Sequence, residues 1–214
     1  MKTYSVEQII EQVRIKYDEF GTDESEMIVS PDNVDMDTII ASNIGAAYHF
    51  VMMGADLSML EGQNLKVDDD SLEIDKDLVG HIKLPDDFLR VVTVRLSSWK
   101  SSPANVITEG MPEYRMQSDP YACGTFQYPV MAIVNSVEGR FLELYKARTQ
   151  EDTLKSFAYV PSCSSRNNEV NIPDMLSDAF IYYVAGLTAT TFREDVANDF
   201  IKVAKGLIGI EWIR

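Results

Sequence analysis

The hydrophobic period of this chain changes twice, and that change limits the folds open to it. Near both ends apolar residues recur every three or four positions, as on one face of a helix. Between about residues 88 and 160 they alternate with polar residues, as in half-buried strands. We therefore expect an α+β protein in which helices from the two ends of the chain form a helical bundle beside a central antiparallel β-sandwich or sheet.

The expected helices have clear limits. Ser5 and Gln8 form a capping box before an apolar stripe that ends at Gly21. A second helix is predicted from about Asp35 to Met53, after a polar, acidic loop over 22–34. A short helical turn is expected at 55–61, and two further helices after Pro173.

Six strands are expected in the middle of the chain. Pro85 precedes the first, and residues 135–139 join two others as a hairpin loop. The expected strands cover residues 88–96, 105–108, 113–117, 129–135, 140–146 and 155–160. We predict a helical module of residues 1–62 and 172–214 and a β-rich module of residues 63–171.

The net charge of −15 is unevenly distributed. Residues 1–90 carry 20 acidic and 7 basic residues, a net of −13, whereas residues 91–214 carry 14 and 12, a net of −2. Nucleic-acid binding needs basic patches that neutralise phosphates, and the sequence has none. An acidic face is expected instead, and its candidate residues are Asp68, Asp69, Asp70, Glu73, Asp75 and Asp77.

Motifs for catalysis or cofactor binding are missing from the sequence, so we expect no enzyme, no cofactor and no metal. Neither glycine-rich phosphate loop occurs. His49 is expected to pack within a helix, and His81 has no motif that pairs it with Cys163. Cys123 and Cys163 are read as free thiols. No apolar run is long enough for a membrane span, so we expect a protein made in the cytoplasm without a membrane partner.

Two apolar regions are candidate interfaces. The segment 116–129 is an aromatic loop punctuated by proline and glycine, and residues 208–214 form an apolar tail. The candidate interface residues are Tyr121, Phe126, Tyr128, Ile208, Ile210, Trp212 and Ile213. The alternative is that both segments cover the chain's own fold.

Several motifs, in order, resemble the tail tubular protein A family, the adaptor rings of short-tailed phages. Leu84–Arg90 (LPDDFLR) resembles the L-P-x-D-F-L-R motif at that family's first strand, and residues 37–47 resemble its early helix. Val106–Gly110, Phe157–Val160 and Ile172–Ala179 are similar to later elements. The acidic segment 66–77 and the loop 116–129 look longer than in that family.

The resemblance implies a structural virion protein that bridges portal and tail and surrounds the DNA ejection channel. It implies a homo-oligomeric ring, usually a dodecamer, with a portal protein and neighbouring tail or ring proteins as partners. DNA would only pass through the channel, and the acidic residues would line it. The same motifs suit a ring protein lower in the tail, as in crAss-like phages.

Two other classes of function remain open from the sequence. A small metal-dependent hydrolase built around Asp68–Asp70 would bind a divalent metal stoichiometrically. A monomeric protein-binding module would remain a single 24 kDa particle.

Overall fold

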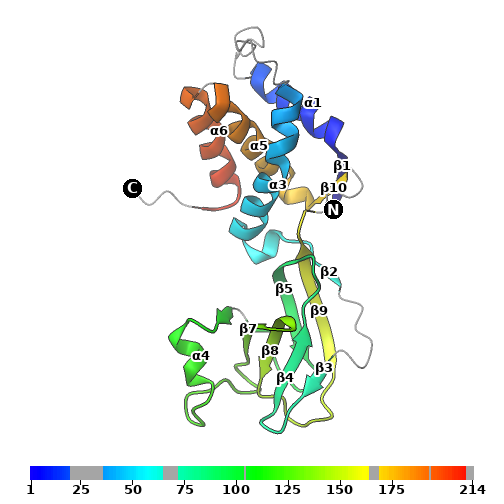
Figure 1. The fold of residues 1–214 in the computed structure, drawn as a ribbon, viewed down its shortest axis with the longest axis vertical. Helices are drawn as coiled ribbons and strands as arrows, with labels where there is room; N and C mark the ends of the chain where they lie inside the picture. Colours follow the sequence, from blue (N-terminus) through cyan, green and yellow to red (C-terminus); the bar gives the residue numbers. More distant parts are fainter. Residues whose placement is uncertain (20–35, 65–71, 104, 164–168, 193, 211–214) are drawn as a thin grey trace. The chain divides into compact units, whose positions relative to one another are not determined.

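The chain folds into two compact units, one mainly helical and one mainly of strands (Figure 1). The computed structural model describes residues 1–19, 36–64, 72–103, 105–163, 169–192 and 194–210. The helical unit comprises residues 1–61 and 161–214, and the β unit comprises residues 62–160. The α+β class expected from the sequence is confirmed.

The helical unit is built around α5 (Ser177–Phe192), which contacts α1 (Val6–Glu19), α3 (Met36–Gly54) and α6 (Glu194–Leu207). The short helix η1 (Leu57–Met59) follows α3, and η4 (Asp174–Leu176) precedes α5. Most of the buried residues of α5 are apolar and lie on several sides of the helix, as expected for a helix enclosed by others. The end of the first helix, expected at Gly21, and the loop expected over 22–34 lie outside the described residues.

Local chemistry explains how the first helix begins. The Gln8 backbone N–H donates to Ser5 Oγ at 3.2 Å, and the Ser5 N–H donates to Gln8 Oε1 at 2.9 Å. This reciprocal pair confirms the expected capping box. Further along α1, Tyr17 Oη donates to the backbone carbonyl of Ala185 at 2.7 Å and so ties α1 to α5.

A two-stranded antiparallel sheet joins the two ends of the helical unit. Strand β1 (Lys2–Ser5) pairs with β10 (Glu169–Ile172), and Lys2 lies opposite Ile172. Neither strand was expected from the sequence. This pairing places residues 161–171 in the helical unit, whereas the sequence placed them in the β-rich module.

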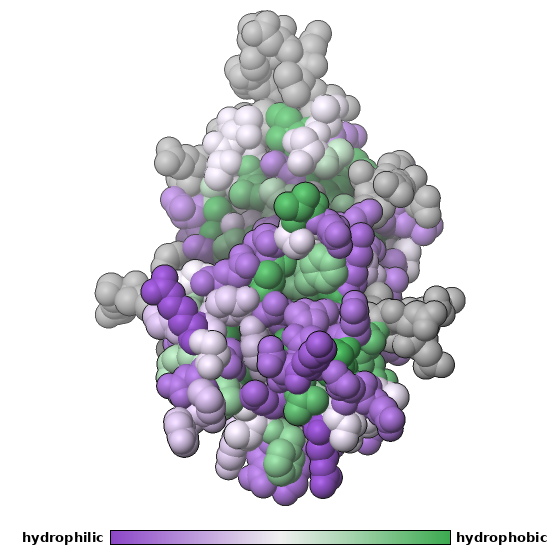
Figure 2. Space-filling view, turned by 60° about the horizontal axis from the view of Figure 1, so that its bottom comes forward, coloured by the Kyte–Doolittle hydropathy of each residue, from purple (hydrophilic) through white to green (hydrophobic). Residues whose placement is uncertain are grey.

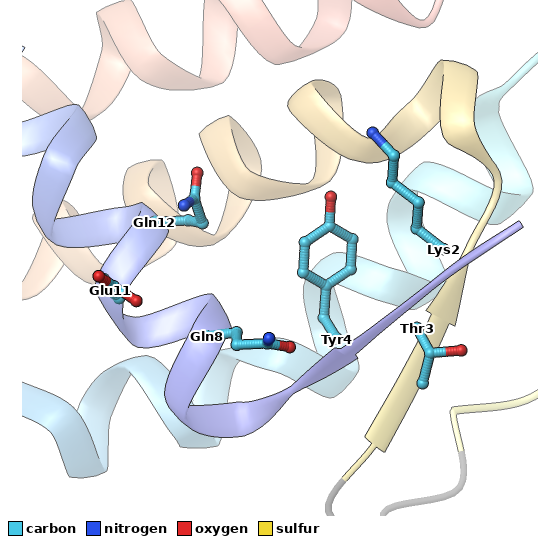
Figure 3. A pocket seen from close by; sticks show the side chains of 6 residues that line it. All are labelled: Lys2, Thr3, Tyr4, Gln8, Glu11 and Gln12. Atoms are coloured by element: carbon cyan, nitrogen blue, oxygen red, sulfur yellow. The ribbon is translucent and has the colours of Figure 1, made fainter.

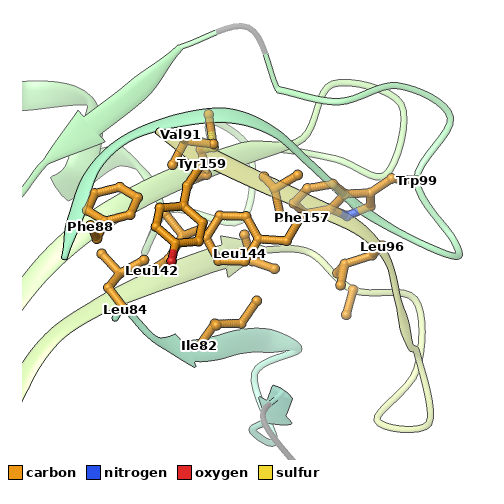
Figure 4. Close-up of a cluster of buried hydrophobic side chains, with 13 residues drawn as sticks. Ile82, Leu84, Phe88, Val91, Leu96, Trp99, Leu142, Leu144, Phe157 and Tyr159 are labelled. Atoms are coloured by element: carbon orange, nitrogen blue, oxygen red, sulfur yellow. The ribbon is translucent and has the colours of Figure 1, made fainter. Parts of the chain in front are cut away.

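The β unit contains two sheets. One has the order β2 (Gln63–Asn64), β9 (Leu154–Pro161), β5 (Phe88–Leu96). The other has the order β3 (Leu72–Ile74), β4 (Val79–Lys83), β8 (Gly139–Tyr145), β7 (Val130–Ser136), β6 (Val106–Thr108). Side chains from both sheets, together with Trp99 after β5, form the larger hydrophobic core, which includes Leu142, Leu144 and Phe157 (Figure 4). Ile107, Ala132 and Tyr145 form a smaller buried cluster.

Two features of the β unit differ from the expected antiparallel arrangement. β6 pairs with β7 in parallel, because the chain between them leaves the sheet and returns to the same end. Residues 113–117 were expected to form a strand, but α4 (Pro112–Met116) is a short helix. Pro112 stands at its first turn, where a missing N–H costs no helical hydrogen bond. The expected hairpin at 135–139 is present, with Ser136 opposite Gly139.

Candidate interaction surface

An arm that leaves the β unit carries its most exposed aromatic side chains. We define the arm as α4 and the following residues 117–129. It contacts β6, at the edge of the five-stranded sheet opposite β3 (Figure 1). The exposed fraction is 99% for Tyr121, 79% for Tyr128 and 42% for Phe126. Of the two alternatives for this segment, covering its own sheet does not describe Tyr121 and Tyr128, whereas Phe126 is partly covered within the chain.

Hydrogen bonds within the arm hold its backbone in one shape. The Gly124 N–H donates to Gln117 Oε1 at 2.9 Å, and the Tyr121 N–H donates to Asp119 Oδ1 at 2.8 Å. The Thr125 N–H donates to the Tyr128 carbonyl at 3.0 Å. The aromatic side chains therefore extend from a structured loop, which lowers the entropy lost when a partner binds.

The arm is attached to the rest of the β unit at two points. The Lys100 N–H donates to the Phe126 carbonyl at 3.1 Å. Tyr114, on α4, lies edge-on to Tyr145 at 6.4 Å between ring centroids, and its hydroxyl donates to Glu143 Oε2 at 3.2 Å. Desolvation is the main cause that raises the pKa of both tyrosines, and the nearby Glu143 carboxylate raises it further. For Tyr114, the hydrogen bond with Tyr145 acts in the opposite direction.

His81 lies between carboxylates on the same face of the sheet. Its Nε2 is 3.3 Å from Asp75 Oδ2, and its Nδ1 is 3.9 Å from Glu143 Oε1. Glu73, on β3, lies opposite His81 in the strand register. Sequence reasoning missed this arrangement because it depends on strands that are distant along the chain. Within the described ranges, no group of three or more His, Cys, Asp or Glu residues could hold a metal ion.

Part of the acidic run has a structural role in the β3–β4 turn. Asp75 Oδ1 accepts hydrogen bonds from the backbone N–H groups of Asp77 and Val79, each at 2.9 Å. Burial acts to raise the pKa of Asp75, but hydrogen bonds from Val79, His81 and Asp77 outweigh it and lower the pKa overall. Glu73 and Asp77 are exposed, whereas the candidates Asp68, Asp69 and Asp70 lie outside the described residues.

The C-terminal tail differs from the expected free apolar surface. Ile208 is 2% exposed and lies against the end of α3, where its Cδ1 would be 3.2 Å from a Cβ placed on Gly54. Ile210 reaches the same glycine and is half-buried. The interpretation of Ile208 as an interface residue is therefore corrected, because the helical unit already buries it. Trp212 and Ile213 lie outside the described residues.

The other singled-out side chains offer little support for catalysis. His49 is exposed on α3, contrary to the expected packing role. His81 belongs to the β unit and Cys163 to the helical unit, and both cysteines are free thiols. Burial raises the pKa of Cys163, which disfavours the reactive thiolate.

The helical unit has a shallow depression beside β1, with a volume of about 340 Å³. Figure 3 shows the side chains that line it, from β1 and the first turns of α1. They are Lys2, Thr3, Tyr4, Gln8, Glu11 and Gln12. The Tyr4 hydroxyl is hydrogen-bonded to Ser177 Oγ at the start of α5, which fixes the ring that forms one wall.

No model of a protein family matches the chain, and no curated protein matches it. No helix in the described part of the chain is long and apolar enough to cross a membrane.

Proposed function

We propose that this protein is a structural, non-enzymatic subunit of the head-to-tail connector or tail of a short-tailed phage. Copies of the chain would close into a ring, with a portal protein and neighbouring tail or ring proteins as partners. Its place of action would be the virion, where DNA passes through the ring during ejection.

The aromatic arm is the observation that carries the proposal. A monomeric soluble protein usually exposes large apolar residues singly, but Tyr121, Phe126 and Tyr128 are exposed together on one hydrogen-bonded loop. Tyrosine and phenylalanine at such sites commonly dominate the binding energy of protein interfaces. The arm therefore favours a protein-binding role over a small-molecule one.

The motifs that resemble adaptor-ring proteins have structural roles consistent with the proposal. Leu84 and Phe88 are buried in the core of the β unit, and the Phe88 N–H donates to the Pro85 carbonyl at the turn before β5. Arg140 donates to the Phe88 carbonyl at 2.9 Å from the neighbouring sheet. In this chain Leu84 and Phe88 of the LPDDFLR segment therefore contribute to the fold of the β unit.

The negative charge of the chain is suited to a channel through which DNA passes without binding. A net charge of −15 repels phosphates, and the excess lies in residues 1–90. A ring also needs two different surfaces on each subunit, since its contacts run head to tail. The arm would provide one of these surfaces.

The test is the mass of the purified protein across a concentration series, measured by light scattering, with negative-stain imaging of large species. We expect closed rings, and we expect the double variant Tyr121→Ser/Tyr128→Ser to need at least tenfold more protein to form them. Val137→Ser is the control, because Val137 is equally exposed but lies on the β7–β8 hairpin. A chain that stays monomeric throughout, and also when mixed with a purified portal ring, would contradict the proposal.

A further inference from the structure

We propose that the arm of one copy binds the depression beside β1 of the next copy, with Tyr121 as the inserted side chain. This inference rests on the proposed ring, for which it names the two surfaces in contact. It commits to a second copy of this chain as the partner.

Tyr121 has the geometry of an inserted side chain. It is 99% exposed, so its ring makes almost no contact within its own chain. Asp119 fixes the backbone around it by accepting hydrogen bonds from Tyr121 at its side chain and from Ala122 and Cys123 at its carbonyl. A tyrosine held in this way can bury a large ring area on binding at a low cost in conformational entropy.

The depression is lined by apolar surface and by hydrogen-bonding groups, both of which can contact a phenol ring and its hydroxyl. The ring of Tyr4 and the aliphatic parts of Gln8 and Gln12 provide apolar walls (Figure 3). Among the lining residues, Lys2 offers a hydrogen-bond donor and Glu11 an acceptor. The depression is open to solvent and has a volume of about 340 Å³.

The arm and the depression are compatible in charge. Two chains that each carry −15 repel one another, so they associate best through their least charged surfaces. Residues 120–137 contain no charged side chain, and they include the tip of the arm. The depression carries one cation, Lys2, and one anion, Glu11, which balance.

The two surfaces are also distinct patches of the chain, as a head-to-tail contact requires. The arm belongs to the β unit and the depression to the helical unit. Two distinct patches can join successive copies without either patch meeting itself, which is the arrangement that closes into rings.

The test is a disulfide cross-link between two single-cysteine variants in a background that carries Cys123→Ser and Cys163→Ser. Tyr121→Cys is mixed with Glu11→Cys under mild oxidation. Glu11 is chosen over Gln8 because Gln8 caps α1. The control mixture pairs Val137→Cys, on the β7–β8 hairpin, with Glu11→Cys. We expect covalent dimers at least tenfold more abundant in the first mixture.

Substitutions tested without cross-linking provide a second measurement. Tyr121→Ala and Gln12→Trp, which fills the depression, should each weaken self-association at least tenfold in light scattering. The two changes together should cost little more than either alone, because they remove the same contact. Tyr121→Phe should retain most of the association.

The possible outcomes distinguish a failure of the proposed arm–depression contact from a failure of the proposed ring. Assembly of the unmodified chain with equal cross-linking in both mixtures, or with additive effects of the two substitutions, would overturn this contact and leave the ring proposal standing. A chain that shows no self-association at any concentration, alone or with a purified portal ring, would overturn both the contact and the ring.

Discussion

At the scale of single residues, Asp152 holds together two loops of the β unit. Its carboxylate accepts hydrogen bonds from the side chains of Ser97 and Ser98 and from the backbone N–H groups of Ser98 and Thr153, both at 3.1 Å. Burial acts to raise the pKa of Asp152, but hydrogen bonds from Ser97, Ser98 and the Arg148 backbone N–H outweigh it, so the pKa is lowered. The charged form is therefore the one that stabilises the fold.

We expect Asp152→Ala to lower the free energy of unfolding by about 1–2 kcal/mol at neutral pH, because it leaves several donors unpaired in a half-buried site. A carboxyl with a lowered pKa contributes stability that is fully present above its unfolded pKa and is lost as the pH falls through its folded pKa. The difference between the two proteins should therefore shrink at acidic pH below about 4. Urea unfolding at several pH values measures it.

The exposed neighbour Glu151 provides the control. Glu151→Ala should change the free energy of unfolding by less than about 0.5 kcal/mol. A loss of similar size in both variants would show that the Asp152 hydrogen bonds contribute no stability.

At the scale of elements, the close approach of α5 and α6 depends on a glycine. A Cβ placed on Gly186 would lie 2.6 Å from Ile201 Cγ1 and 3.1 Å from the Ile201 backbone nitrogen. The second atom belongs to the main chain of α6, so a side-chain rotation cannot relieve the contact. The two helices therefore pack at this distance only with glycine at position 186.

We expect Gly186→Ala to destabilise the protein by about 1–3 kcal/mol, because α6 must move away from α5. Gly45→Ala is the matched control in α3, where nothing lies within 4 Å of the added Cβ. That change should stabilise the protein by about 0.5–1 kcal/mol, since alanine is the better helix former. Urea unfolding of both variants gives the comparison, and equal effects would contradict the close approach.

At the scale of the whole molecule, charge opposes self-association and uncharged aromatic surface favours it. The chain carries −15, and on the face seen in Figure 2 hydrophobic residues stand in small groups among hydrophilic ones. No broad apolar face is visible there to offset the repulsion. Association through the arm should therefore depend strongly on the screening of charge.

We expect self-association to strengthen as ionic strength rises from about 0.01 M to about 0.15 M, because the Debye length falls from about 30 Å to about 8 Å. Light scattering at constant protein concentration measures the change. Association that weakens with added salt would show that ion pairs, and not aromatic contacts, hold the copies together.

The sequence by itself determined the elements whose signals are local. Ser5 and Gln8 fixed the start of α1, the apolar stripes located α3, α5 and α6, and Gly139 marked the β7–β8 hairpin. Each of these signals lies within a few residues of the backbone that it directs. The exposed aromatic residues of the arm were also identified, because loops with such a composition commonly face solvent or a partner.

Only the tertiary structure decided which distant segments meet. The β1–β10 sheet joins residues 168 apart, as in the hydrogen bond from Thr3 to Asn171. The parallel β6–β7 pair and the placement of His81 beside Glu143 likewise depend on strand order. The sequence predicted Ile208 as part of a free apolar tail, but the end of α3 covers it. Periodicity shows that a side chain needs burial, but the partner that buries it is set by packing across the whole chain.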